Sequence, residues 1–170
     1  MNSTERREKI IRLLIENNMP IKGNKLAEKY SVTRQVIVKD IAILRAKGNN
    51  IIATPDGYII NKVNNRVKAI IAVNHSEEDM INEMKIVLKY GGIIEDVIVE
   101  HPLYGEIKGM LMVSNYNELE KFINKCNKQK ARLLSVLTNG VHLHTISAEN
   151  NENIELILSD LKDNNFIISD

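Results

Sequence analysis

The residues of this chain that are best suited to chemistry are its four histidines, His75, His101, His142 and His144. His142 and His144 are separated by one residue on a predicted strand. Because successive side chains of a strand point to opposite faces, both imidazoles are expected on the same face of a sheet. Two imidazoles at that spacing can bind one metal ion.

Two further residues could complete such a site. His75 ends a predicted strand, and Glu83 lies two turns along the helix that follows, where its carboxylate could supply an oxygen ligand. Three imidazole nitrogens and one oxygen suit zinc, nickel or iron(II), whereas calcium and magnesium prefer oxygen ligands. The residues alone leave two alternatives open, a metal site or a structural, half-buried His-x-His pair. A metal site requires that the strand before His75 and the strand of His142 lie close together.

Alternating strands and helices must position these side chains. Ser76 is expected to cap a helix that Gly91 and Gly92 end. The remaining pattern predicts strands at 67–73, 93–100, 107–113, 133–137 and 141–148, and helices at 117–128 and 152–161. The order βαββαββα predicts an α+β sandwich, with helices on one face of a mainly antiparallel sheet.

The first third of the chain has the pattern of a winged helix-turn-helix. A helix over 25–30, a turn over 31–33, a helix from Arg34 to about Ala46, and a hairpin of strands 51–53 and 58–60 are expected. Thr33 is expected to cap the second helix and Gly48 to end it. Its buried face is predicted from apolar residues at helical spacing, Val36, Ile37, Ile41 and Leu44. This order of elements is typical of a DNA-binding domain.

The candidate DNA contacts lie on the other face of the second helix. Arg34, Gln35 and Lys39, which follow Thr33 near the start of that helix, are the candidates for base or phosphate contact. Arg45 and the hairpin around 49–54 are expected to touch the DNA backbone. Exposed basic residues on a helix can also be merely solvated, and the sequence does not separate the two readings.

The distribution of charge agrees with a DNA-binding first part. Up to Lys68 the chain has 14 Lys and Arg against 6 Asp and Glu, a balance of +8, and from Ala69 onward it has 9 against 16, a balance of −7. A basic domain supplies phosphate contacts, whereas an acidic domain is repelled by DNA. The acidic part is therefore expected to have a different role.

Length and composition limit the class of protein. A chain of 170 residues is long enough for two small domains, expected here at 1–63 and 66–170 with a short boundary near 61–66. No apolar run approaches the roughly 20 residues that span a bilayer, so no membrane association is expected. Cys126 is the only cysteine, which excludes an internal disulfide and favours the reducing cytoplasm.

Both halves resemble the niacin-responsive transcriptional repressor family. The stretch TRQVIVKDIAILRAKGNNIIATPDGYII is similar to its winged helix-turn-helix, and the acidic half to its 3H regulatory domain. The matching motifs are His75 with Glu83, EDVIVEHPLYG around His101, and LTNGVHLHT around His142 and His144. The resemblance extends over nearly the whole chain.

The resemblance implies a cytoplasmic homodimer that represses genes for NAD synthesis or niacin uptake, with nicotinic acid as co-repressor. It implies one bound transition metal per chain, with His75, Glu83, His142 and His144 as ligands. A symmetric dimer predicts an inverted-repeat operator with half-sites about one helical turn apart, or a multiple of that spacing.

Two roles stay open for His101, contact with the carboxylate of nicotinate and packing at a dimer interface; Tyr104 is a candidate wall of the effector pocket. Two other classes of protein also stay open. In a metal-sensing repressor the metal itself would be the signal. An enzyme fused to a DNA-binding domain is disfavoured, because the acidic half lacks a Gly-rich phosphate loop and a recognisable catalytic triad.

Overall fold

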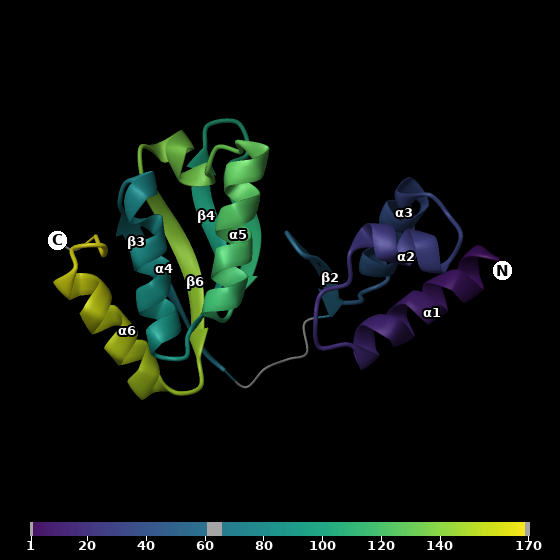
Figure 1. The fold of residues 1–170 in the computed structure, drawn as a ribbon, viewed down its shortest axis with the longest axis horizontal. Helices are drawn as coiled ribbons and strands as arrows, with labels where there is room; N and C mark the ends of the chain where they lie inside the picture. The colour runs from purple at the N-terminus through teal and green to yellow at the C-terminus, as the bar shows by residue number, and fades with distance from the viewer. Residues whose placement is uncertain (1, 61–65, 169–170) are drawn as a thin grey trace. The chain divides into compact units, whose positions relative to one another are not determined.

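The structure, a computed structural model, describes residues 2–60 and 66–168 and divides into two compact units, Met1–Asn64 and Asn65–Asp170 (Figure 1). The boundary predicted near 61–66 falls almost entirely outside the described residues. Each unit has a hydrophobic core of its own. No helix of the described residues combines the length and the apolar character that crossing a membrane requires.

The first unit is a winged helix-turn-helix, as predicted. Its elements are α1 (Ser3–Glu16), α2 (Gly23–Lys29), α3 (Arg34–Ala46), β1 (Ile51–Thr54) and β2 (Gly57–Ile60). The strands β1 and β2 form an antiparallel hairpin, and Ile21 adds a bridge to Tyr58 beside it. The core collects one face of each helix and the start of the hairpin, through Ile10, Leu14, Leu26, Ile37, Ile41, Leu44 and Ile51. Val36, expected on the buried face of α3, is only partly buried.

Local chemistry sets the ends of α3 at the predicted residues. The Thr33 hydroxyl accepts a hydrogen bond from the Val36 amide at 3.4 Å, which satisfies one free donor of the first turn. At the other end Gly48 has a φ of +89°, the left-handed conformation that stops a helix with little strain in a residue without Cβ. The helix that carries the candidate DNA contacts is therefore held at both termini.

The second unit is a four-stranded antiparallel sheet with helices on one face (Figure 1). Its elements are β3 (Val67–Asn74), η1 (Glu77–Asp79), α4 (Met80–Lys89), β4 (Ile93–His101), β5 (Gly105–Val113), α5 (Tyr116–Gln129), η2 (Leu134–Thr138), β6 (Val141–Ala148) and α6 (Asn151–Asp163). The strand order is β3-β6-β4-β5, so β6, the last strand in sequence, lies between two earlier ones. The core lies between the sheet and the helices α4, α5 and α6.

One predicted strand is absent. Residues 133–137 were predicted to form a strand before the one that begins at Val141, but Leu134–Thr138 form the short 3-10 helix η2. Both edges of β6 are already paired, with β3 on one side and β4 on the other, so a preceding hairpin strand has no edge to join. The element order of the described residues in this unit is therefore βαββαβα, if the short 3-10 helices are left out.

The predicted cap at Ser76 is also wrong in its detail. The chain enters α4 through the 3-10 turn η1, and the Ser76 side chain makes no capping bond to a backbone amide. Its hydroxyl donates instead to the Asp79 carboxylate at 3.0 Å. The Ser76 backbone carbonyl accepts a hydrogen bond from His75 Nδ1 at 2.7 Å.

Candidate functional site

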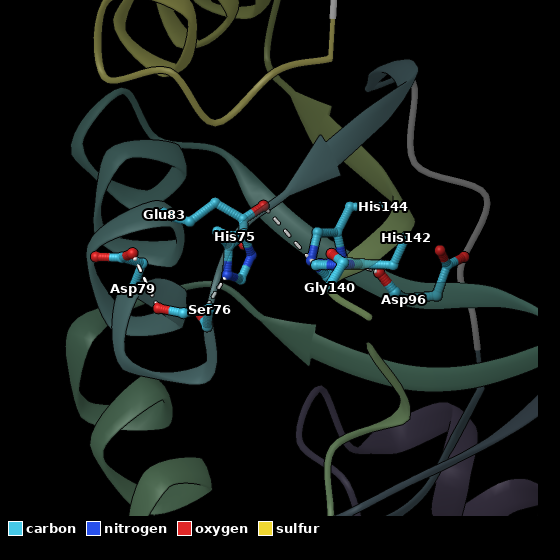
Figure 2. A network of polar contacts seen from close by, with 8 residues as sticks. All are labelled: His75, Ser76, Asp79, Glu83, Asp96, Gly140, His142 and His144. Carbon is cyan, nitrogen blue, oxygen red and sulfur yellow. Dashed lines mark hydrogen bonds and ion pairs between the residues drawn. The ribbon is translucent and has the colours of Figure 1, made fainter. Parts of the chain in front are cut away.

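The pairing of β3 with β6 brings the distant histidines together. The strands are antiparallel with Val73 opposite His142 and Ile71 opposite His144, so the end of β3 lies beside the start of β6. His75 follows β3 directly, and Glu83 projects from α4, which covers this face of the sheet. Figure 2 shows the side chains of His75 and Glu83 pointing towards the rings of His142 and His144. The proximity on which a metal site depends is therefore present.

The four side chains meet at contact distances. Glu83 Oε2 lies 2.7 Å from His75 Nε2, and Glu83 Oε1 lies 3.5 Å from His144 Nε2. His142 Nε2 lies 3.1 Å from His144 Nε2. His75, Glu83 and His142 each offer one ligand atom, and these atoms lie within 4.8 Å of one another. Ligands about 2.1 Å from a zinc ion in tetrahedral geometry are separated by about 3.4 Å, so a small inward movement would close the set on one ion.

Backbone carbonyls orient all three rings. His75 Nδ1 donates to the Ser76 carbonyl at 2.7 Å, and His142 Nδ1 donates to the Gly140 carbonyl at 2.8 Å. His144 Nδ1 donates to the Asp96 carbonyl at 2.6 Å. A carbonyl can only accept, so each Nδ1 carries the proton and each Nε2 faces the centre. Hydrogen bonding from the outer nitrogen of a histidine to a carbonyl is typical of metal ligands.

The inner nitrogens lie at hydrogen-bond distance from one another or from Glu83. Since every Nδ1 donates, the bond between His142 Nε2 and His144 Nε2 requires a proton on one inner nitrogen as well. Burial would lower the pKa of His144, but the Glu83 carboxylate outweighs burial and raises it. Burial and the nearby His144 lower the pKa of His142 to about 4. Of these two rings, His144 therefore holds a proton on its inner nitrogen more readily than His142 does.

The same reasoning applies to His75 and Glu83. Burial would lower the pKa of His75, but its hydrogen bond and charge interaction with Glu83 raise it. Burial would raise the pKa of Glu83, yet His144 and His75 hold it at about 2. The carboxylate is thus ionised although it is only 1% exposed. A cation bound at this point would compete with protons for the inner nitrogens, because imidazole binds a metal in its neutral form.

The donor set fits a transition metal. Glu83 Oε1 is buried and has no hydrogen-bond partner among the described residues, an unusual state for a carboxylate oxygen. The borderline imidazole nitrogens and a single carboxylate suit zinc, nickel or iron(II). Phe166 contributes an apolar wall, with its ring centroid 5.7 Å from that of His75. Burial, ring orientation and a carboxylate oxygen that makes no hydrogen bond, only the 3.5 Å contact with His144, together suit a cation site.

Asp96 is a supporting residue that the sequence did not reveal. The pairing of β4 shifts register between Ile94 and Asp96, and this bulge turns the Asp96 carbonyl towards the His144 ring. Its buried carboxylate accepts from the Thr145 amide at 2.9 Å and pairs with Lys108 at 3.4 Å, which pins the bulge to both neighbouring strands. Bulges next to functional sites commonly re-aim a side chain in this way. Sequence has no reliable signal for a bulge.

His101 and Tyr104 are not brought into this cluster. His101 Nδ1 accepts from the backbone amides of Leu103 and Tyr104, at 3.1 and 3.3 Å, so the ring closes its own turn between β4 and β5. The Tyr104 ring lies beside it, with centroids 5.0 Å apart, and Tyr104 is 70% exposed. Within residues 66–168 no hydrogen bond or ring contact joins His101 to the other histidines. The effector role of both residues stays a prediction.

The candidate DNA contacts all lie on the surface of the first unit. Thr33, Arg34, Gln35, Lys39 and Arg45 are exposed, and they share the outer side of α3 with Val38 and Ala42. The opposite side of the helix is buried in the core. This is the arrangement in which a recognition helix enters the major groove with its polar face.

A buried ion pair that sequence reasoning missed fixes α3 to α1. Asp40 is 2% exposed, and its carboxylate accepts from Arg6 Nε at 2.6 Å and from Arg7 Nη1 at 3.3 Å. A carboxylate in the middle of an apolar helix face was the available signal, since buried charges in proteins are nearly always paired. The contact links α1 to α3 by charge as well as through the shared core.

A helix-turn-helix domain joined to a sensor-like domain with a buried histidine cluster defines the chain as a transcriptional regulator. Comparison with known proteins agrees with this class. Residues 6–59 match a helix-turn-helix domain family and residues 68–170 match the 3H domain family.

Two curated relatives align along nearly their full length. The probable transcription repressor NiaR of Thermotoga maritima is 46% identical over 98% of this chain and 95% of its own. The transcription repressor NadR of Bacillus subtilis is 37% identical over 97% of this chain and 94% of its own. The chain belongs to the 3H-domain family of niacin-responsive transcriptional repressors, as its sequence motifs predicted. It is a DNA-binding regulator and not an enzyme.

Proposed function

We propose that the second unit holds one divalent transition metal through His75, Glu83, His142 and His144, and that nicotinic acid binds at or near this metal as co-repressor. The observation that supports the proposal best is the meeting of three inner imidazole nitrogens and a buried carboxylate, in which His75 and His144 contact Glu83 and His142 contacts His144. When bound, the metal supplies a positive charge that attracts an anion into an otherwise acidic unit.

The chain's own residues prepare the site. Three carbonyls orient the rings, and the pairing of β3 with β6 sets their spacing. Nicotinate is a flat aromatic anion with a ring nitrogen and a carboxylate, so an imidazole or the metal could bind either end. His101 and Tyr104, at the turn between β4 and β5, remain the proposed further contacts.

We propose that the signal reaches DNA through a homodimer that works in the cytoplasm. Ligand contacts that favour one arrangement of two chains would favour the separation at which both α3 helices reach successive major grooves of an inverted repeat. Thr33, Arg34, Gln35, Lys39 and Arg45 are the proposed DNA contacts. The regulated genes would be those of NAD synthesis or niacin uptake.

A titration with related ligands tests this proposal. The metal-loaded protein is titrated calorimetrically with nicotinic acid, with nicotinamide, which lacks the carboxylate, and with benzoic acid, which lacks the ring nitrogen. Stoichiometric binding of nicotinic acid alone is expected, with a 5- to 150-fold gain in DNA affinity, the range typical of allosteric coupling. Equal binding of all three, or no gain in DNA affinity, would contradict co-repression.

A second candidate is a repressor for which the metal itself is the signal. His75, Glu83 and His142 could hold a metal ion without any organic ligand, so occupancy of the site could itself report metal availability. This candidate predicts that DNA affinity follows the concentration of added metal when no organic ligand is present.

A further inference from the structure

Two exposed apolar side chains lie in the middle of the otherwise polar outer face of α3. Val38 is 45% exposed and is the only large hydrophobic side chain of this helix exposed to that degree. Ala42, one turn later, is exposed as well. Arg34 precedes Val38 by one turn, and Arg45 follows Ala42 by about one turn, so the four residues form a continuous row.

The first unit itself gives Val38 no structural role. The core receives the opposite side of α3, through Ile37, Ile41 and Leu44. A β-branched side chain is a slightly poorer helix former than the Ala, Lys and Arg that occupy neighbouring exposed positions. A polar residue at position 38 would suit both the helix and the solvent better, unless a partner contacts the methyl groups.

The flanking charges restrict the partner. Arg34, Lys39 and Arg45 surround the apolar pair, and within the described residues none of the three is neutralised by an ion pair. A surface that combines cations with exposed methyl groups complements a polyanion that itself presents methyl groups. The major groove of DNA meets both conditions, because thymine is the only standard base with a C5-methyl group there.

We propose that Val38 and Ala42 read the C5-methyl groups of thymines in the operator, next to the bases or phosphates that Arg34, Gln35 and Lys39 contact. The inference rests on the proposed entry of α3 into the major groove and goes beyond it, since it assigns a sequence preference to two non-polar residues. Each half-site should therefore contain one or two thymines whose methyl groups contribute to affinity.

The test begins by finding the DNA that the protein selects. Duplexes with a randomised core are incubated with the full chain in the presence of nickel or zinc and nicotinic acid, and the retained sequences are read. Each thymine of the selected half-site is then replaced by deoxyuridine, which pairs identically but lacks the methyl group. Binding is measured by fluorescence anisotropy for the unchanged chain, Val38→Ala, Ala42→Ser and the control Val136→Ala, which alters an exposed valine of η2.

Loss of the methyl group at one or two positions should weaken binding by about fourfold, the factor expected from one buried methyl group. In Val38→Ala the deoxyuridine effect should nearly disappear at one of these positions and persist at the others, and Val136→Ala should behave like the unchanged chain. Val38→Ala places a better helix former at an exposed position, so it is expected to fold. A half-site without thymine, or deoxyuridine effects that persist in both α3 variants, would overturn the inference.

Two further variants separate this failure from failure of the DNA-reading role. If Arg34→Ala and Lys39→Ala weaken binding but no methyl effect depends on Val38 or Ala42, α3 is still the reader and only the thymine assignment is wrong. If neither Arg34→Ala nor Lys39→Ala changes affinity, or if no sequence is enriched, α3 is not the reader and both proposals are wrong. A change in oligomeric state in Val38→Ala, with unchanged deoxyuridine effects, would identify Val38 as a protein contact and also overturn the inference.

Discussion

His142 Nε2 and His144 Nε2 lie 3.1 Å apart, although both outer nitrogens of these rings donate to backbone carbonyls. Two neutral imidazoles in this orientation would direct lone pairs at each other. The contact is favourable only with a proton or a cation between the rings, and the raised pKa of His144 beside the lowered pKa of His142 agrees with a shared proton. A metal cation bound between the rings would take the place of that proton.

Removal of both facing imidazoles should abolish metal binding. In His142→Ala/His144→Ala only His75 and Glu83 remain, too few ligands for a structural transition-metal site. Elemental analysis after dialysis should find about one metal per chain in the unchanged protein and almost none in the variant. His101→Ala is the matched control, since His101 caps its own turn and should leave the metal content unchanged. Metal retained by the double variant would show that the ligand set is wrong.

Metal affinity should rise with pH. Folding raises the pKa of His75 and of His144 above the ordinary 6.5, so protons compete with a metal for these two nitrogens up to a higher pH than in a free histidine. Each displaced proton adds a slope of about one log unit of affinity per pH unit, so the slope should approach two at pH values below both pKa values and fall to zero above them. Competition with a chromophoric chelator at several pH values measures the slope, and a flat profile would contradict competition between protons and the metal.

Gly140→Ala should weaken metal binding because Gly140 packs closely against the His75 backbone and also contacts His142. A Cβ at position 140 would lie 2.7 Å from the His75 carbonyl oxygen, and φ there is +96°. The Gly140 carbonyl also orients His142. We expect a loss of affinity of about 10- to 100-fold, the range found when supporting contacts of ligands are removed.

Gly105→Ala is the matched control for this change. Gly105 also has a positive φ, +72°, but nothing lies within 4 Å of its added Cβ. Both variants bear the backbone strain, and only Gly140→Ala bears the clash. Equal loss of metal affinity in the two would mean that strain, and not the position of the His75 carbonyl, is responsible.

Asp40→Ala should destabilise the DNA-binding unit. The change leaves Arg6 and Arg7, whose side chains are 11% and 16% exposed, without their carboxylate. Removal of one partner from a buried ion pair costs about 3 kcal/mol or somewhat more. Thermal unfolding followed by circular dichroism should show a lower midpoint for this unit, with unchanged metal content. Glu16→Ala, which alters an exposed carboxylate of α1, is the control and should leave the midpoint unchanged.

Lys39→Ala should change the salt dependence of DNA binding. If Lys39 contacts a phosphate, its removal lowers the slope of log affinity against log salt by about one unit, because one fewer counterion is released. Lys121→Ala, an exposed lysine of α5 in the other unit, is the control and should leave the slope unchanged. An unchanged slope in both variants would place Lys39 away from the DNA backbone.

Local sequence signals were sufficient for the elements whose ends depend on nearby residues. Thr33 and Gly48 mark the ends of α3, and the apolar spacing of Ile37, Ile41 and Leu44 identifies its buried side. The alternation in β6 placed His142 and His144 on one face correctly. These features depend on hydrogen bonds and side-chain directions within a few residues, and therefore local sequence can predict them.

The same local reasoning failed where pairing partners decide the outcome. Residues 134–138 are apolar enough for a strand, yet they form η2 because β6 is already paired on both edges. The bulge at Asp96 and the ion pair of Asp40 with α1 likewise depend on strands and helices that are distant in sequence. The residues near each of these positions do not identify the distant partner.

For the histidine cluster, sequence alone established the residue types and the shared face of His142 and His144. Only the tertiary structure decided that β3 runs beside β6, and hence that His75 and Glu83 reach the same point. It also decided the proton arrangement, because a pKa depends on burial and on charges brought close by folding. These distant residues meet because of the order of the strands in the sheet. That order depends on how whole strands and helices pack against one another, which no short stretch of sequence specifies.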